Sequence, residues 1–179
     1  MKDAGVDDRP PDDANRLCLS CGMCCDSTLF LHGSIRNDEQ ADARANGFTV
    51  AAIGDALKFP QPCHCLDGMA CTAYRTWRPQ VCSRFRCAVL TRMESGEIDV
   101  DVAMDRVAKA KELLTRLPGE LRTRREMQQF ADRAQTKMRD GMLDRNDALR
   151  ITTIIATMRY LDSEFRTAGM TVLSSDDSV

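Results

Sequence analysis

The chain has 179 residues, of which 43% are hydrophobic and 29% are charged, so it can form a packed core and is not wholly disordered. Its 25 Lys and Arg residues against 27 Asp and Glu residues give a formal net charge of −2. That balance argues against a protein whose whole surface binds nucleic acid or anionic membranes. The nine cysteines all lie between Cys18 and Cys87, and this local concentration predicts a functional site in the first half of the chain.

Residues 1–15 contain five aspartates and two prolines, which predicts a flexible acidic N-terminus. They include no apolar stretch of the kind found in signal peptides, and no later segment has the ~18 unbroken apolar residues of a transmembrane helix. We therefore expect a cytoplasmic protein without a membrane partner. In a reducing compartment, cysteines bind metals or carry out redox chemistry more often than they form disulfides. The odd number of cysteines and the adjacent Cys24 and Cys25 also disfavour a disulfide-stapled domain.

Residues 16–92 form the predicted cysteine-cluster module. Proline residues at 60 and 62 interrupt regular structure at the entry to the second group of cysteines. Before them, we expect a cysteine loop over 16–26, a strand over 27–31 ended by Gly33, a polar helix that opens at 37–40 and stops at Gly47, and a strand over 48–53.

Residues 93–170 are predicted to form three helices separated by Gly and Pro residues. Apolar residues recur there at spacings of three and four, so each helix has one buried face. The expected buried positions are Ala103, Val107, Ala110, Leu114 and Leu117, then Met127, Phe130, Ala131, Ala134 and Met138, then Ile151, Ile154, Ile155, Met158, Leu161 and Phe165. Residues 171–179 are expected to form a flexible tail. The predicted fold class is α+β and mainly α, with a small irregular cysteine-rich metal module packed on a C-terminal three-helix segment.

The cysteines fall into two groups whose spacing favours metal ligation. In the first group, gaps of two residues let a loop curl around one centre, and thiolates are strong ligands for zinc and for iron–sulfur clusters. This group comprises Cys18, Cys21, Cys24 and Cys25, and the second comprises Cys63, Cys65, Cys71, Cys82 and Cys87. Eight thiolates fit two four-thiolate sites, or one cluster with several structural cysteines.

Other residues fall in a fixed order among these cysteines. The order is Cys18-x-x-Cys21-Gly22-x-Cys24-Cys25, Cys65-Leu66, Cys71-x-x-Tyr74, Arg78-Pro79-x-x-Cys82-x-x-Phe85 and Cys87. It resembles the pattern of the YkgJ-type cysteine-cluster family, which is described as a zinc- or iron-chelating domain. The resemblance covers roughly residues 16–90 and implies eight metal ligands: Cys18, Cys21, Cys24, Cys25, Cys65, Cys71, Cys82 and Cys87.

The chain departs from this family pattern at two positions. The family places Arg directly after the cysteine that precedes Phe, whereas Ser83 stands there in this chain and Arg84 follows it. Cys63 is additional, so the pattern leaves open whether Cys63 or Cys65 is the ligand. The two histidines, His32 and His64, could each replace a thiolate, but a lone histidine near a cluster is more often an outer hydrogen-bond donor or a surface residue.

The identity of the metal follows from the first cysteine group. Its triple run resembles the segment that supplies three ligands to a [4Fe–4S] cluster, so we expect an iron–sulfur cluster, with zinc as the alternative. Arg78 and Arg84 belong to an arginine-rich stretch without acidic residues, and we expect them to offset the charge of the thiolates. The alternative is an anion or RNA patch, with Tyr74, Trp77 and Phe85 as stacking surfaces.

The function predicted from the sequence is metal binding in an electron-transfer or structural role. No phosphate-binding loop, nucleophile elbow or His-Glu-x-x-His motif is present, so we favour a protein that is not an enzyme. One alternative is a protein-modifying or redox enzyme, because flagellin lysine methylases carry a similar cysteine motif. The other is a zinc-stabilised module that recruits a protein partner through its helices. The metal is the expected ligand, and nucleic acid is not an expected partner.

Overall fold

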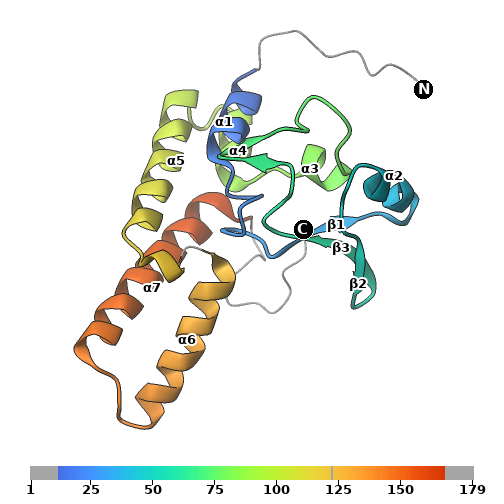
Figure 1. The fold of residues 1–179 in the computed structure, drawn as a ribbon. Helices are drawn as coiled ribbons and strands as arrows, with labels where there is room; N and C mark the ends of the chain where they lie inside the picture. The colour runs from blue at the N-terminus through green and yellow to red at the C-terminus, as the bar shows by residue number, and fades with distance from the viewer. Residues whose placement is uncertain (1–11, 122, 168–179) are drawn as a thin grey trace. The chain divides into compact units, whose positions relative to one another are not determined.

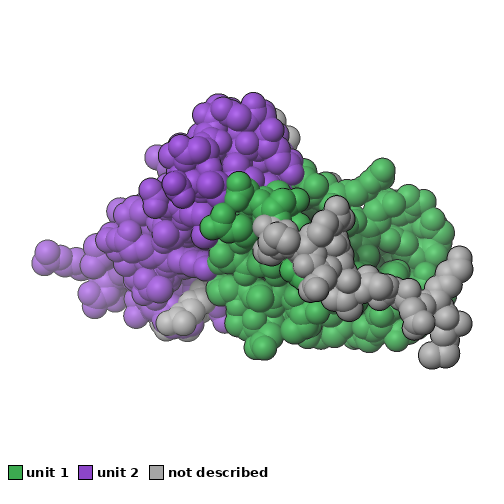
Figure 2. Space-filling model, turned by 90° about the horizontal axis from the view of Figure 1, so that it is seen from above, with its two compact units in different colours: residues 1–86, 176–179 green, residues 87–175 purple. Residues whose placement is uncertain are grey.

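The structure is a computed structural model that describes residues 12–121 and 123–167 (Figure 1). These residues divide into two compact units, an N-terminal unit of residues 12–86 and a C-terminal unit of residues 87–167 (Figure 2). Most of the predicted acidic N-terminus and the whole predicted tail over 171–179 lie outside the described residues.

Helix α1 (Asp13–Cys21) opens the N-terminal unit and corrects the predicted cysteine loop over 16–26. The backbone N–H of Asn15 donates to the side chain of Asp12 at 2.8 Å, which caps the first turn. Gly22 ends the helix in the left-handed conformation, with φ at 72°. The helix is short and buries only Leu17 and Cys21, four positions apart, so these two end signals define where it begins and ends.

A three-stranded antiparallel sheet follows, in the order β1-β3-β2. Gly33 pairs with Phe59 across two of its strands, and a Cβ at Gly33 would lie 2.3 Å from the Phe59 ring. The glycine therefore lies within a strand, where the ring needs its space, and the predicted strand over 27–31 is wrong. The predicted strand over 48–53 is confirmed at its C-terminal end. The strands are β1 (His32–Ile35), β2 (Ala51–Ile53) and β3 (Ala56–Pro60).

Short elements complete the N-terminal unit. The predicted polar helix is confirmed as a 3-10 turn, η1 (Asn37–Glu39), that continues into α2 (Gln40–Ala45), with Gly47 at φ 84° beyond its end. A two-stranded hairpin and a last helix lie further along the chain: β4 (Leu66–Asp67), β5 (Ala70–Cys71) and α3 (Gln80–Arg84). One core cluster of the unit comprises Ile35, Ala43, Phe48, Phe59, Cys63 and Cys65, and the unit also buries Leu17, Met23, Leu29 and Phe30.

The C-terminal unit consists of helices, and its three long helices confirm the prediction. The last two lie side by side as a hairpin (Figure 1). The long helices begin after Asp99, Thr123 and Asp144, whose side chains each accept a backbone hydrogen bond from the first turn. The elements are α4 (Ala88–Glu94), which was not predicted, α5 (Val100–Thr115), η2 (Gly119–Leu121), α6 (Arg124–Arg139) and α7 (Arg145–Phe165).

The predicted apolar faces of these helices are buried at most positions. Two predicted core residues are wrong: Met138 is 64% exposed and Ile155 is 47% exposed. Met138 lies in the last turn of α6, next to the loop that ends the hairpin. Ile155 is one position, about 100° around the helix, from the buried Ile154. The confirmed core positions are Ala103, Val107, Ala110, Leu117, Met127, Phe130, Ala134, Ile154, Met158, Leu161 and Phe165.

The fold class is α+β and mainly α, as predicted, with seven α-helices and five short strands in the described residues. Among the described helices, none combines the length and the apolar character needed to cross a membrane.

Candidate metal centre

Five cysteines from four stretches of the N-terminal unit meet in one apolar core. Cys63 and Cys65 are buried members of that core, and Cys25, Cys71 and Cys82 pack against it. We refer to these five residues as the thiol cluster. All nine cysteines of the chain are described, and none of them takes part in a disulfide bond. Four of the eight predicted ligands therefore lie in one region of the fold, together with the additional Cys63.

Backbone hydrogen bonds hold the stretches of the thiol cluster together. The N–H of Cys63 donates to the carbonyl oxygen of Cys25 at 2.8 Å, which joins the two cysteine groups of the sequence. Across the β4–β5 hairpin, the N–H of Thr72 donates to the carbonyl oxygen of Cys65 at 2.8 Å. The residue before Thr72 is Cys71, so the hairpin brings that thiol next to the Cys63–Cys65 turn.

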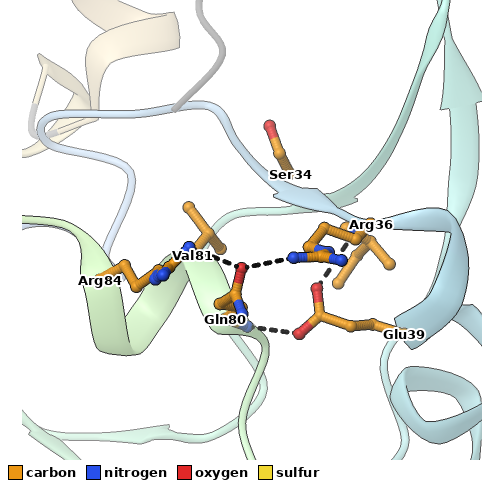
Figure 3. A pocket seen from close by; sticks show the side chains of 7 residues that line it. Ser34, Arg36, Glu39, Gln80, Val81 and Arg84 are labelled. Carbon is orange, nitrogen blue, oxygen red and sulfur yellow. Dashed lines mark hydrogen bonds between the residues drawn. The ribbon is translucent and has the colours of Figure 1, made fainter.

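Helix α3 carries Cys82, and a carboxylate from a distant segment fixes its first turn. Glu39 accepts hydrogen bonds from the backbone N–H of Gln80 at 2.7 Å and from that of Arg36 at 3.2 Å. The side-chain oxygen of Gln80 in turn accepts from the guanidinium groups of Arg36 and Arg84 at 3.0 and 3.3 Å (Figure 3). These residues line a cavity of about 200 Å³. The network fixes the position of α3 and therefore of Cys82.

For four members of the thiol cluster, the environment favours the protonated thiol in the absence of a cation. Burial raises the pKa of Cys65 to about 11 and that of Cys82 to about 12, and the charge of neighbouring thiols adds to both. Burial also raises the pKa of Cys25 and of Cys71. These are therefore not the exposed, acidic thiols of a nucleophilic site, which have a lowered pKa. A bound cation would supply the missing stabilisation of the thiolates.

Three consecutive residues bring their ligand atoms closest together. The N–H of Leu66 donates to the carbonyl oxygen of Cys63 at 3.0 Å, and this turn places the sulfur atoms of Cys63 and Cys65 and a ring nitrogen of His64 within 4.8 Å of one another. Among the described residues, this is the one group of three such side chains that meets at ligand distance. An ion at the usual Zn–S and Zn–N lengths holds its ligand atoms about 3.5–3.8 Å apart, so the group fits a metal ion.

The other three cysteines of the first group, Cys18, Cys21 and Cys24, lie outside the thiol cluster. Cys18 and Cys21 lie one turn apart on α1, which contacts β5, and Cys24 follows in the next loop. Burial raises the pKa of Tyr74, and the charge of Cys18 contributes to that rise. The Tyr74 hydroxyl donates a hydrogen bond to the side chain of Asn15, which lies on α1 like Cys18 and Cys21. These three thiols thus line the α1 side of the unit and do not form a group at ligand distance.

Cys87, the eighth predicted ligand, belongs to the C-terminal unit. It is the N-cap residue of α4, where the N–H of Leu90 donates to its sulfur at 3.5 Å. Burial raises its thiol pKa.

The two predicted charge-compensating arginines differ in their surroundings. The Arg78 guanidinium lies over the Tyr74 ring at 3.9 Å, and its charge lowers the pKa of Cys71 and of Cys82 against the larger effect of burial. Arg84 donates to Gln80 in the α3 network. The contact between Arg78 and Tyr74 also occupies the ring face that a stacked base would need.

The sequence pattern leaves open whether Cys63 or Cys65 is a ligand, and it predicts His64 as an outer hydrogen-bond donor or a surface residue. The structure brings the ligand atoms of all three residues together, and the Cys-His-Cys run is a local signal for such a group. Comparisons of the chain with protein-family models, with curated proteins and with solved structures found no match.

Proposed function

We propose that the N-terminal unit is a metal-binding module in which thiolates of the thiol cluster hold a metal ion that stabilises the fold. The observation that carries this proposal is the convergence of five cysteines from four stretches of chain, two of them among the six buried members of one core cluster and three packed against it. Structural metal sites supply folding free energy in small units of this kind. The resemblance of the sequence to the YkgJ-type family, described as zinc- or iron-chelating, supports the same function.

An iron–sulfur cluster is the second candidate, and the number of thiols favours it. Cys18, Cys21 and Cys24 retain the spacing of a cluster-binding run, and thiolates from the thiol cluster could complete such a site. A cluster would add an electron-transfer role. Cytoplasmic location and a protein partner remain parts of this proposal that rest on the sequence alone.

Anaerobic purification followed by metal and sulfide analysis tests the proposal. We expect stoichiometric zinc in a colourless protein, whereas a brown protein with acid-labile sulfide would support the cluster. Cys63→Ser and Cys65→Ser should each lose most of the metal, and Cys87→Ser in the C-terminal unit should retain it. A protein that is purified without metal, binds neither Zn²⁺ nor iron, and is not stabilised by them would contradict metal binding. Equal loss in Cys87→Ser would instead favour the eight-cysteine ligand set.

A further inference from the structure

His64 is held beside the thiol cluster by contacts with three successive residues, Asn46, Gly47 and Phe48. Its Nε2 atom lies 3.2 Å from the sulfur of Cys65 and 3.2 Å from the carbonyl oxygen of Asn46. Its ring packs edge-on against Phe48, with the ring centroids 4.5 Å apart. A Cβ at Gly47 would come within 3.3 Å of Nε2, so the glycine leaves room for the imidazole. The loop after α2 therefore fixes the ring next to the thiols.

His64 is more exposed to solvent than the two cysteines on either side of it. Cys63 and Cys65 are 9% and 8% exposed, whereas His64 is exposed. The imidazole thus forms the solvent-facing side of the Cys63–His64–Cys65 group, and the sulfur atoms form the buried side.

We infer that His64 is a metal ligand, and that it completes through Nε2 a single-ion site with Cys63, Cys65 and a third thiolate from Cys25, Cys71 or Cys82. This inference rests on the proposed function and specifies its chemistry as three sulfur ligands and one nitrogen ligand. Such a set is typical of zinc. Neither Cys63 nor His64 belongs to the eight-cysteine pattern, so the site is not the one that the pattern implies.

The distances favour one ion over a cubane at this group. The Cys65 sulfur and the His64 nitrogen are 3.2 Å apart, close to the separation of about 3.5 Å that one zinc ion gives its S and N ligands. In a [4Fe–4S] cluster, each thiolate binds a different iron atom, so its ligand atoms lie further apart. Ligation by Nε2 requires the proton on Nδ1, and it replaces the hydrogen bond between Nε2 and Asn46.

The test compares full-length wild-type protein with His64→Ala and with the control variant His32→Ala, which changes the other histidine of the chain, on β1. Zn²⁺ affinity is measured by competition with a chromophoric chelator. The visible spectrum of the Co²⁺-substituted protein reports the ligand set, because replacement of nitrogen by water or sulfur shifts the ligand-field bands. X-ray absorption of wild-type protein loaded with Zn²⁺ counts sulfur and imidazole ligands without any substitution.

We expect imidazole scattering with three sulfur ligands in the wild-type protein. His64→Ala should bind Zn²⁺ about 100-fold or more weakly, beyond the roughly 10–100-fold cost of losing an outer hydrogen-bond partner, and it should shift the Co²⁺ bands. His32→Ala should change neither. A wild-type site with four sulfur ligands and no imidazole, or an unchanged Co²⁺ spectrum in a folded His64→Ala variant, would overturn the inference and leave His64 as a hydrogen-bond partner of Asn46. Failure of the wild-type protein to bind either ion would instead contradict the proposed function.

Discussion

At the scale of single residues, Arg78 places a positive charge near two members of the thiol cluster, Cys71 and Cys82. Its guanidinium lowers the pKa of Cys71 and Cys82, so its removal should raise both and reduce the fraction of thiolate at a given pH. We expect Arg78→Gln to slow the alkylation of these two thiols in metal-free protein and to move the pH profile of alkylation upward. Arg84→Gln, whose recorded bond is to Gln80, is the matched control. Equal slowing in both variants would show that the effect is not specific to Arg78.

Glu39 acts on the site through α3. Its carboxylate accepts a hydrogen bond from the backbone N–H of Gln80 in the first turn of that helix, where the N-cap residue Pro79 makes no side-chain hydrogen bond. Glu39→Ala should destabilise the first turn by about 1 kcal/mol, the usual cost of losing a capping side chain, and should weaken metal binding through Cys82. Thermal unfolding and Zn²⁺ affinity measure the two effects. Glu97→Ala, at an exposed position in the C-terminal unit, should change neither.

At the scale of elements, periodicity predicted the helices whose apolar residues repeat and missed those that depend on end signals. The three long helices were found because each buries one regular face. Helix α1 was missed because its stability comes from the Asp12 cap and from Gly22, and its sequence otherwise suggests a cysteine loop. The strand β1 was shifted because Gly33 is a packing glycine under Phe59 and not a terminator. Local sequence cannot distinguish these two uses of glycine.

The candidate site, like the fold, was predicted only in part from the sequence. The cysteine pattern predicted the region of the candidate site and included four of the five members of the thiol cluster. It left open whether Cys63 or Cys65 belongs to the site, because the bond between Cys63 and Cys25 joins segments 38 residues apart. The Cys-His-Cys run is a local signal for His64, but the position of its ring also depends on the turn ending at Leu66 and on the loop after α2. Contacts between distant segments decide which thiols meet, and no spacing rule contains them.

The α6–α7 hairpin depends on a small apolar cluster, and Phe130 is its largest side chain. Phe130 is 7% exposed and packs with Ile154 and Met158 of α7. Phe130→Ala should therefore lower the free energy of unfolding of the C-terminal unit by about 3–5 kcal/mol. The exposed Met138 on the same helix is the control, and Met138→Ala should stay within about 0.5 kcal/mol. Chemical denaturation measured by circular dichroism distinguishes them, and similar costs in both variants would contradict the assigned core.

At the scale of the whole molecule, the proposed function predicts that the two units obtain their stability from different sources. The C-terminal unit buries apolar helix faces, whereas in one core cluster of the N-terminal unit two of the six buried members are cysteines. Removal of metal by a chelator should therefore expose the backbone of residues 12–86 and leave α5, α6 and α7 protected. Hydrogen–deuterium exchange with mass spectrometry measures both parts in one sample. Undiminished protection of residues 12–86 after complete metal removal would show that the metal does not stabilise the unit.

The protonation state of the thiol cluster makes metal binding by the whole protein dependent on pH. Burial raises the pKa of Cys65 to about 11 and that of Cys82 to about 12, so at pH 7 both thiols carry their protons in the metal-free protein. Each thiol that becomes a ligand must lose its proton. Zn²⁺ binding at pH 7 should therefore release one proton from each of these raised-pKa thiols that becomes a ligand, and the apparent binding constant should rise about tenfold per pH unit for each proton released.

Calorimetric titrations in buffers of different ionisation enthalpy count the released protons, and competition with a chelator between pH 6 and 8 gives the slope. Because the folded pKa values lie above this range, the affinity should increase with pH throughout it and fall as the pH is lowered. Cys65→Ser should release about one proton fewer than the wild-type protein wherever its residual binding can be measured. The Cys87→Ser variant should release the same number as the wild-type protein, since Cys87 lies in the other unit. Binding that releases no protons and has a constant independent of pH would mean that oxygen or neutral nitrogen atoms hold the ion, and the thiol cluster would then have no part in its coordination.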